Sequence, residues 1–173
     1  MSDQKLPIKF AECVEFNIPA FHTRPTLPLS FTDISNAERR LSEAQAVNGA
    51  TYSALENLFN EGYREAKKNL SIVRYEITQA KKHLRQVTSI HLLDNYPDFL
   101  KEKGLKDHAA NREAYLARQE DYEEAMDRLA MLEALKDLLE GKVQNFVNVC
   151  RYMKKEIDIL IKSGIVNNKY TSR

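Results

Sequence analysis

The C-terminal third of the chain carries apolar residues at alternating steps of three and four, the heptad spacing of helices that pack side by side. Residues at this spacing line one stripe of an α-helix, and the stripe is stable only when another helix covers it. One residue, Lys136, interrupts the pattern. The repeat predicts a coiled coil or a long helical hairpin. Its members are Leu129, Leu132, Leu139, Val143, Phe146, Cys150, Met153, Ile157 and Leu160.

A second repeat with the same spacing precedes the first and can supply its partner. A capping box, in which Ser35 and Glu38 satisfy each other's backbone N–H groups, predicts the start of this helix. Asn48-Gly49 could form a turn before a second capping box at Ser53, but the repeat keeps its phase across it. We therefore expect one continuous helix over residues 36–88. Its stripe consists of Ala37, Leu41, Ala44, Asn48, Thr51, Leu55, Leu58, Gly62, Ala66, Leu70, Val73, Ile77, Ala80, Leu84 and Val87.

A connector over residues 89–107 separates the two repeats. Within it, Pro97 suits the first position of a short helix and Gly104 suits the C-terminal end of that helix. The second long helix is expected over residues 108–163, with an exit at Gly164. Two long helices joined by a short connector predict an antiparallel hairpin, so the expected fold class is all-α. Apolar residues off the stripe predict a further packing partner for the second helix; these are Leu135, Leu138 and Val147.

Residues 1–31 form an extended N-terminal arm, followed by the helical hairpin domain over residues 32–173. Apolar and polar residues alternate from Ile8 to Ile18, which predicts one strand. A lone strand has unpaired backbone groups, so it needs an edge or a helical surface to cover. The arm could cover the protein's own helices or a neighbouring subunit, and we favour the former. Four prolines prevent a sustained helix and four aromatic rings are available for contact: Pro7, Pro19, Pro25, Pro28, Phe10, Phe16, Phe21 and Phe31.

The composition indicates a helical protein without a membrane span. No apolar run approaches the about 18 residues that a span needs, and the N-terminus lacks the apolar core of a secretory signal. A cytoplasmic location is therefore expected. The two cysteines, Cys13 and Cys150, agree with a reducing compartment, and we do not expect a disulfide between them. The unpaired arm and the off-stripe apolar residues together predict a homo-oligomer.

Charge is arranged in blocks along the chain. Residues 62–91 carry a net charge of +5 and residues 112–140 carry −5. When Leu70 is placed at heptad position a, three cations flank the stripe at position e. We expect these cations to pair with carboxylates of the second helix, with residue 74 opposite about residue 122. The three cations are Lys67, Arg74 and Lys81.

Four further cations occupy positions b and f, which point away from the partner helix. Ser71, Thr78 and Tyr75 lie among them. Cations, hydroxyls and an aromatic ring are the groups that hold a phosphate backbone and stack a base. The face therefore predicts a binding site for single-stranded nucleic acid. Its residues are the outward cations Arg64, Lys68, Lys82 and Arg85, the ring of Tyr75, and the flanking cations Lys67, Arg74 and Lys81.

Two other interpretations of this basic face stay open. It could be a solvated surface, or it could bind the acidic face of a neighbouring copy. The acidic residues are Glu113, Glu120, Glu123, Asp127 and Asp137. A second basic cluster is the weaker candidate, because the antiparallel hairpin would place it beside the acidic first third of the preceding helix. It consists of Arg151, Lys154, Lys155 and Lys162, with Tyr152 nearby.

No catalytic or metal-binding motif accompanies these patterns. The chain has no glycine-rich phosphate loop and no nucleophile elbow. The sequence therefore predicts neither an enzyme nor a bound metal or cofactor. Its four histidines lack the spacing of a zinc site: His22, His83, His91 and His108.

Two stretches of the chain carry a family resemblance. The first runs from Ala37 to Gln86 and includes Ala80-Lys81-Lys82-His83-Leu84; the second joins Ala110-Asn111-Arg112-Glu113-Ala114-Tyr115-Leu116 to Met153-Lys154-Lys155-Glu156-Ile157-Asp158. Over about residues 37–170 the chain resembles phage recombination mediators of the UvsY-like family.

The resemblance implies an oligomeric, non-enzymatic factor of the host-cell cytoplasm. Such a factor binds single-stranded DNA and helps to load a recombinase onto strands covered by single-strand-binding protein. The alternative function is a phage virion or assembly structural protein that acts only through helical protein contacts.

Overall fold

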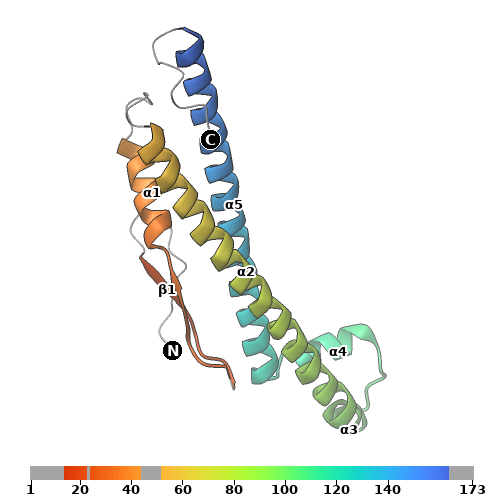
Figure 1. Cartoon of the computed structure of the whole chain (residues 1–173). Coiled ribbons are helices and arrows are strands. Elements are labelled where there is room, and N and C mark those ends of the chain that lie inside the picture. Colours follow the sequence, from red (N-terminus) through yellow and green to blue (C-terminus); the bar gives the residue numbers. More distant parts are fainter. Residues whose placement is uncertain (1–13, 23, 44–51, 164–173) are drawn as a thin grey trace. The chain divides into compact units, whose positions relative to one another are not determined.

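Figure 1 shows the computed structural model, which describes residues 14–22, 24–43 and 52–163. The described chain is predominantly helical, and the predicted all-α fold class is confirmed. Its two long helices are α2 (Tyr52–Ile90) and α5 (Glu120–Lys162). The chain divides into two compact units. The first contains the residues up to Leu70 and from Leu138 onward, and the second contains Ser71–Asp137.

The N-terminal arm forms a β-hairpin in the first unit. β1 (Glu15–Ile18) pairs antiparallel with β2 (Leu27–Ser30), and Phe16 lies opposite Leu29. The prediction of a lone strand without an edge is wrong, because the same arm supplies the second strand. β2 contains Pro28, and both strands of a two-stranded sheet are edge strands, where proline is tolerated. Ile8 and Phe10 lie outside the described residues.

Apolar side chains of the arm are buried within the chain. The side chains of Ile18 and Phe31 are 0% exposed, and those of Leu29 and Phe16 are 1% and 6% exposed. Phe21 is half-buried and bonds through its backbone to Arg24, which closes the hairpin. This burial favours the interpretation in which the arm covers the protein's own surface.

α1 (Thr32–Glu43) folds back along α2 in the first unit. The Cβ atom of Ala37 lies 3.0 Å from the place that a Cβ would take at Gly62. In one continuous helix these residues would be about 38 Å apart. The predicted continuous helix over residues 36–88 is therefore wrong, and the chain reverses between Glu43 and Tyr52. The turn signal Asn48-Gly49 lies outside the described residues.

The first helix also begins earlier than the capping box predicts. α1 starts at Thr32, and the N–H of Ser35 already donates to the carbonyl of Phe31 at 2.8 Å. Glu65 of α2 holds this helix start, because its carboxylate accepts from the N–H of Ile34 at 3.0 Å and from the Ser30 hydroxyl at 2.7 Å. One carboxylate thus joins the hairpin, α1 and α2.

Gly62 allows three helices to approach one another. A Cβ at this position would lie 3.0 Å from Cζ of Phe146 on α5 and 3.2 Å from the backbone oxygen of Asp33 on α1. The side chains of Phe146 and Ala37 are buried around it. The two apolar stripes predicted from the heptad repeats therefore do face each other here.

We expect Gly62→Ala to lower the free energy of unfolding by about 1 kcal/mol, because overpacking a filled core costs about 1–3 kcal/mol and exceeds the helix-propensity gain of about 1 kcal/mol. Gly141→Ala is the matched control, since nothing lies within 4 Å of its Cβ position on α5. It should raise the stability by about 0.5–1 kcal/mol. Urea unfolding followed by circular dichroism measures both. Equal stabilisation by the two changes would contradict the close approach at Gly62.

In the second unit α2 and α5 run antiparallel. His91 Nε2 lies 2.7 Å from Asp121 Oδ1, and Lys81 Nζ lies 2.9 Å from Glu133 Oε1. Leu135 is fully buried and takes the place in the apolar stripe where the repeat has Lys136. The further packing partner that was predicted for Leu135 therefore lies within the chain. Leu138 and Val147 of the first unit are half-buried. The buried residues of the second-unit stripe are Val73, Ile77, Ala80, Val87, Ala125, Leu132 and Leu135.

A buried ion pair lies in the same stripe. Arg128 Nη2 is 3.4 Å from Glu76 Oε2, and the two side chains are 6% and 4% exposed. Removing one partner of a buried pair leaves an uncompensated charge, whereas removing both can be neutral. The pair therefore penalises any register of the two helices that separates its members.

The connector follows the sequence prediction in outline. α2 passes into a π-helical segment, His91–Asn95, and then into α3 (Tyr96–Lys103), with Pro97 in the first turn. Gly104 ends α3 with a φ of 62°, the left-handed conformation that glycine adopts without steric cost.

The second long helix is interrupted, so the prediction of one helix over residues 108–163 is wrong. α4 (Ala109–Leu116) begins after His108, whose Nδ1 accepts from the N–H of Asn111. The N–H groups of Arg118 and Gln119 donate to carbonyls three residues earlier and close α4. Acidic residues then open α5, where negative charge is favourable at a helix N-terminus: Glu120, Asp121 and Glu123.

We expect Arg128→Met to cost about 3–5 kcal/mol of unfolding free energy, because it strips Glu76 of its buried counter-charge. The double variant Glu76→Leu with Arg128→Met should unfold near the wild-type free energy, since neither charge remains. Urea unfolding at neutral pH compares the three proteins. A double variant that is less stable than Arg128→Met would show that the ion pair does not control the packing.

Candidate nucleic-acid interface

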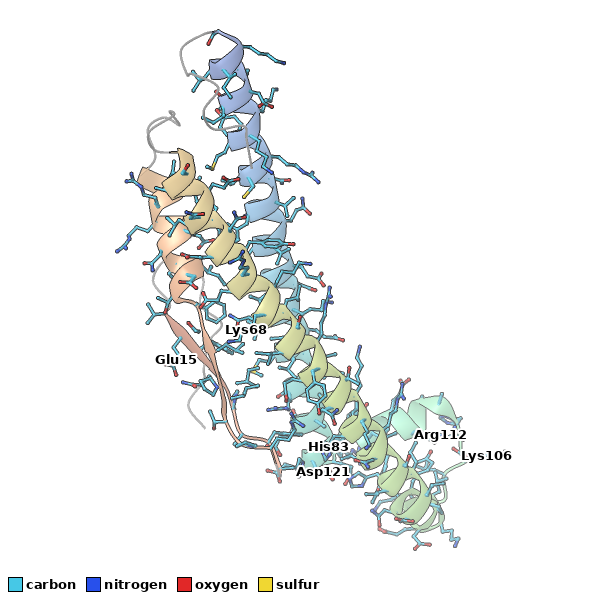
Figure 2. The ribbon with its side chains drawn as sticks, in the orientation of Figure 1. Glu15, Lys68, His83, Lys106, Arg112 and Asp121 are labelled. Atoms are coloured by element: carbon cyan, nitrogen blue, oxygen red, sulfur yellow. The ribbon has the colours of Figure 1, made fainter. Side chains whose placement is uncertain are left out.

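The outward face of α2 carries exposed cations in the first unit. Arg64 and Lys68 lie one helical turn apart, and both are exposed. Lys68 is labelled in Figure 2. Within the described part of the chain, neither side chain has an ion pair or hydrogen bond. These are the positions b and f at which the heptad register predicts outward cations. Neighbouring Lys67 is also exposed, with its Nζ 5.7 Å from the ring centroid of Tyr63.

The residues of α2 that belong to the second unit also carry exposed cations. Lys82 and Arg85 are exposed, and they too lack an ion pair to any residue that the structure describes. The ring of Tyr75 is 56% exposed. Tyr75 and Lys82 are seven residues apart, about two turns, so they share one face of the helix. A phosphate at Lys82 would thus have an aromatic ring along the same face.

The flanking cations behave differently from the outward ones. Lys81 pairs with Glu133 of the acidic stretch, as predicted. The predicted register is wrong, however, because Asp121 contacts His91 and residue 74 does not lie opposite about residue 122. Arg74 is exposed, and its backbone oxygen accepts the Thr78 hydroxyl at 3.1 Å. Lys81 therefore has a structural role, and the hydroxyl proton of Thr78 is used within its own helix.

Several other cations of the described chain form ion pairs. Lys142 pairs with Glu38, and Arg112 Nη2 lies 2.6 Å from Asp107 Oδ2. On α3, Lys101 lies 3.3 Å from Asp98. Arg64, Lys68, Lys82 and Arg85 of α2, by contrast, form no ion pair with any residue that the structure describes.

The second basic cluster is also exposed. Arg151, Lys154, Lys155 and Lys162 of α5 have no side-chain ion pair within the described residues. Glu38, at the acidic start of the preceding helix, pairs with Lys142. Glu56 of the same acidic stretch and Lys154 of the cluster both act on the Cys150 thiol, so the expectation that the cluster partly answers this acidic stretch stays a prediction.

An aromatic cluster in the second unit is the feature that sequence reasoning missed. The rings of Tyr96, Phe99 and Tyr115 lie with centroids 5.0–6.2 Å apart, and Tyr96 and Tyr115 are buried. Two residues labelled in Figure 2 mark this region: Lys106 lies on the segment between α3 and α4, and Arg112 lies on α4. The guanidinium of Arg112 holds the pKa of Asp107 below its usual value through a hydrogen bond.

This cluster has the character of a folding contact. Burial raises the pKa of the Tyr96 hydroxyl, and the Asp107 carboxylate raises it further. The tyrosine therefore stays neutral and serves as a packing group between α3 and α4. The sequence could have predicted this cluster only if the break between α4 and α5 had been known, because that break makes the segment with Tyr115 a separate helix.

Other chemistries find little support in the described residues. No group of three or more His, Cys, Asp or Glu side chains in this part of the chain could hold a metal ion. Cys150 is a free thiol, and burial raises its pKa, which lowers its content of reactive thiolate. None of the described helices is both long and apolar enough to cross a membrane.

Comparisons with known proteins return no relatives. No protein-family model matches the chain, and neither the curated proteins nor the solved structures contain a match.

Proposed function

We propose that the protein is an oligomeric mediator of recombination that binds single-stranded DNA and helps to load a recombinase onto strands covered by single-strand-binding protein. The proposal combines the resemblance of residues 37–170 to the UvsY-like family with the chemistry of α2. The observation that carries it is the set of exposed cations on α2 that have no partner in the described chain: Arg64, Lys68, Lys82 and Arg85.

The binding mode follows from this surface. Lysine and arginine side chains on a helix neutralise phosphates without reading bases, and the released counterions make the affinity depend on salt. The exposed ring of Tyr75 can stack on a base, and stacking is tolerant of sequence because every base has a flat face. Such contacts suit a factor that must bind any strand.

Oligomerisation multiplies these weak contacts. Each protomer offers a few phosphate contacts, and linked copies gain avidity because every further contact is intramolecular. Exposed apolar residues at the end of α2 are available for contacts between copies, since Ile90 is 54% exposed and Leu93 of the π-helical segment is 74% exposed. A mediator of this kind needs no catalytic group.

A second candidate function is a virion or assembly structural protein. It is favoured by the exposure of acidic residues on α4 and α5, which could dock on the basic face of another copy. All five acidic residues of the predicted face are exposed in the second unit: Glu113, Glu120, Glu123, Asp127 and Asp137. The two functions differ in what charge reversal on α2 would do.

We expect the wild-type protein to bind a labelled single-stranded oligonucleotide. The logarithm of its affinity should fall with the logarithm of the salt concentration at a slope of about −3, because each of four phosphate contacts contributes about −0.7. Lys82→Glu with Arg85→Glu should flatten the slope by about 1.4. Tyr75→Ala should weaken binding by about 1–3 kcal/mol. Fluorescence anisotropy over a salt series measures all three.

Light scattering and circular dichroism on the same variants separate the alternatives. Under the mediator proposal, charge reversal leaves the subunit number and the helix content unchanged. Dissociation of the oligomer by Lys82→Glu with Arg85→Glu, together with no binding of DNA by the wild type at low salt, would support the assembly protein and rule out the mediator.

A further inference from the structure

The C-terminal part of α5, in the first unit, has two chemically distinct faces. Met153 and Ile157 are buried, at 2% and 7% exposure. Helix geometry places Arg151, Lys155 and Lys162 within about 40° of one another around the axis, on the opposite side from these two residues. All three cations are exposed. The helix thus presents a compact basic face to solvent.

An exposed aromatic ring borders this basic face. Tyr152 is 60% exposed, and it lies one turn before Lys155 on the same side of the helix. Ile159, 48% exposed, lies about two turns further along. Tyr152 and Ile159 together offer an exposed aromatic and an exposed aliphatic side chain beside the cations, and a ligand with flat apolar surfaces could contact both.

Local charge balance accounts for the cations only in part, because the exposed Asp158 lies one turn before Lys162 on the same side of the helix. No side chain of Arg151, Lys155 or Lys162 forms an ion pair with another described residue. The acids in this stretch are Asp158, which is exposed, and Glu156, which is half-buried. The helix dipole favours cations only in the last turn, which explains Lys162 but neither Arg151 nor Lys155.

We propose that Arg151, Tyr152, Lys155 and Lys162 form a second surface for single-stranded nucleic acid, separate in sequence from the basic face of α2. The proposal rests on the proposed function for its ligand class, but its residues are independent of the α2 site. Phosphates would contact the three cations, while a base stacks on Tyr152 and touches Ile159. The exposed ring favours a nucleic acid over an acidic peptide, which would need only the charges.

The test compares charge reversals of equal size by fluorescence anisotropy of labelled oligothymidylate over a salt series. Arg151→Glu with Lys155→Glu should flatten the salt slope by about 1.4. Tyr152→Ala should weaken binding about 5- to 150-fold, whereas Tyr152→Phe should bind like the wild type. The matched control is Lys101→Glu with Lys103→Glu on α3, whose cations are exposed but paired with Asp98 and Glu102. The control should leave the slope unchanged.

The outcome for α5 is read beside Arg64→Glu with Lys68→Glu on α2. If the α2 reversal flattens the slope and the α5 reversal matches the control, the second surface is refuted and the proposed function stands. If only the α5 reversal acts, the second surface stands and the α2 site is wrong. No binding by the wild type refutes both. A labelled glutamate-rich peptide that binds the wild type and is lost on α5 reversal, with DNA binding intact, would assign the surface to an acidic partner and overturn the inference.

Discussion

The close approach at Gly62 is the contact on which the arrangement of the first unit depends. α1 can lie against α2 and α5 there because residue 62 has no side chain, and Phe146 fills the space that remains. That position of α1 brings the N–H of Ile34 to Glu65, and the same carboxylate binds the Ser30 hydroxyl of the hairpin. The absence of a side chain at residue 62 therefore allows the contacts through which Glu65 binds the N-terminal arm, although the arm and Gly62 are far apart in sequence.

Charge has two separate uses in this chain. Between packed helices, ion pairs determine which residues lie opposite each other. Arg128 pairs with Glu76 where both are buried, and Lys142 pairs with Glu38. A wrong alignment of the helices would leave such charges without compensation. On the outward positions of α2, by contrast, Arg64, Lys68, Lys82 and Arg85 form no ion pair with another described residue. The proposed function assigns these cations to the phosphates of a polyanion.

The heptad spacing predicted much of the buried face, because the period of an α-helix alone decides which residues share a side. Leu41 of the predicted stripe is nevertheless 42% exposed. It could not predict that the chain reverses between Glu43 and Tyr52, since a stripe keeps its phase whether or not the helix continues. The break before α5 was missed because backbone hydrogen bonds at Arg118 and Gln119 close α4, and apolar spacing carries no record of them. The outward positions of the α2 cations were predictable from the heptad register, but the partner of Lys81 required the three-dimensional alignment of the helices.

The most direct test of the α2 interface is photocrosslinking of the full-length protein to a single-stranded oligonucleotide that contains 5-iodouracil, followed by peptide mass spectrometry. Iodouracil crosslinks to an aromatic ring only when a base lies against it. We expect an adduct on Tyr75, which is exposed on the same face of α2 as Lys82, and none on the buried ring of Tyr96. Bound oligonucleotide without any adduct on Tyr75 would contradict a base-stacking interface on α2.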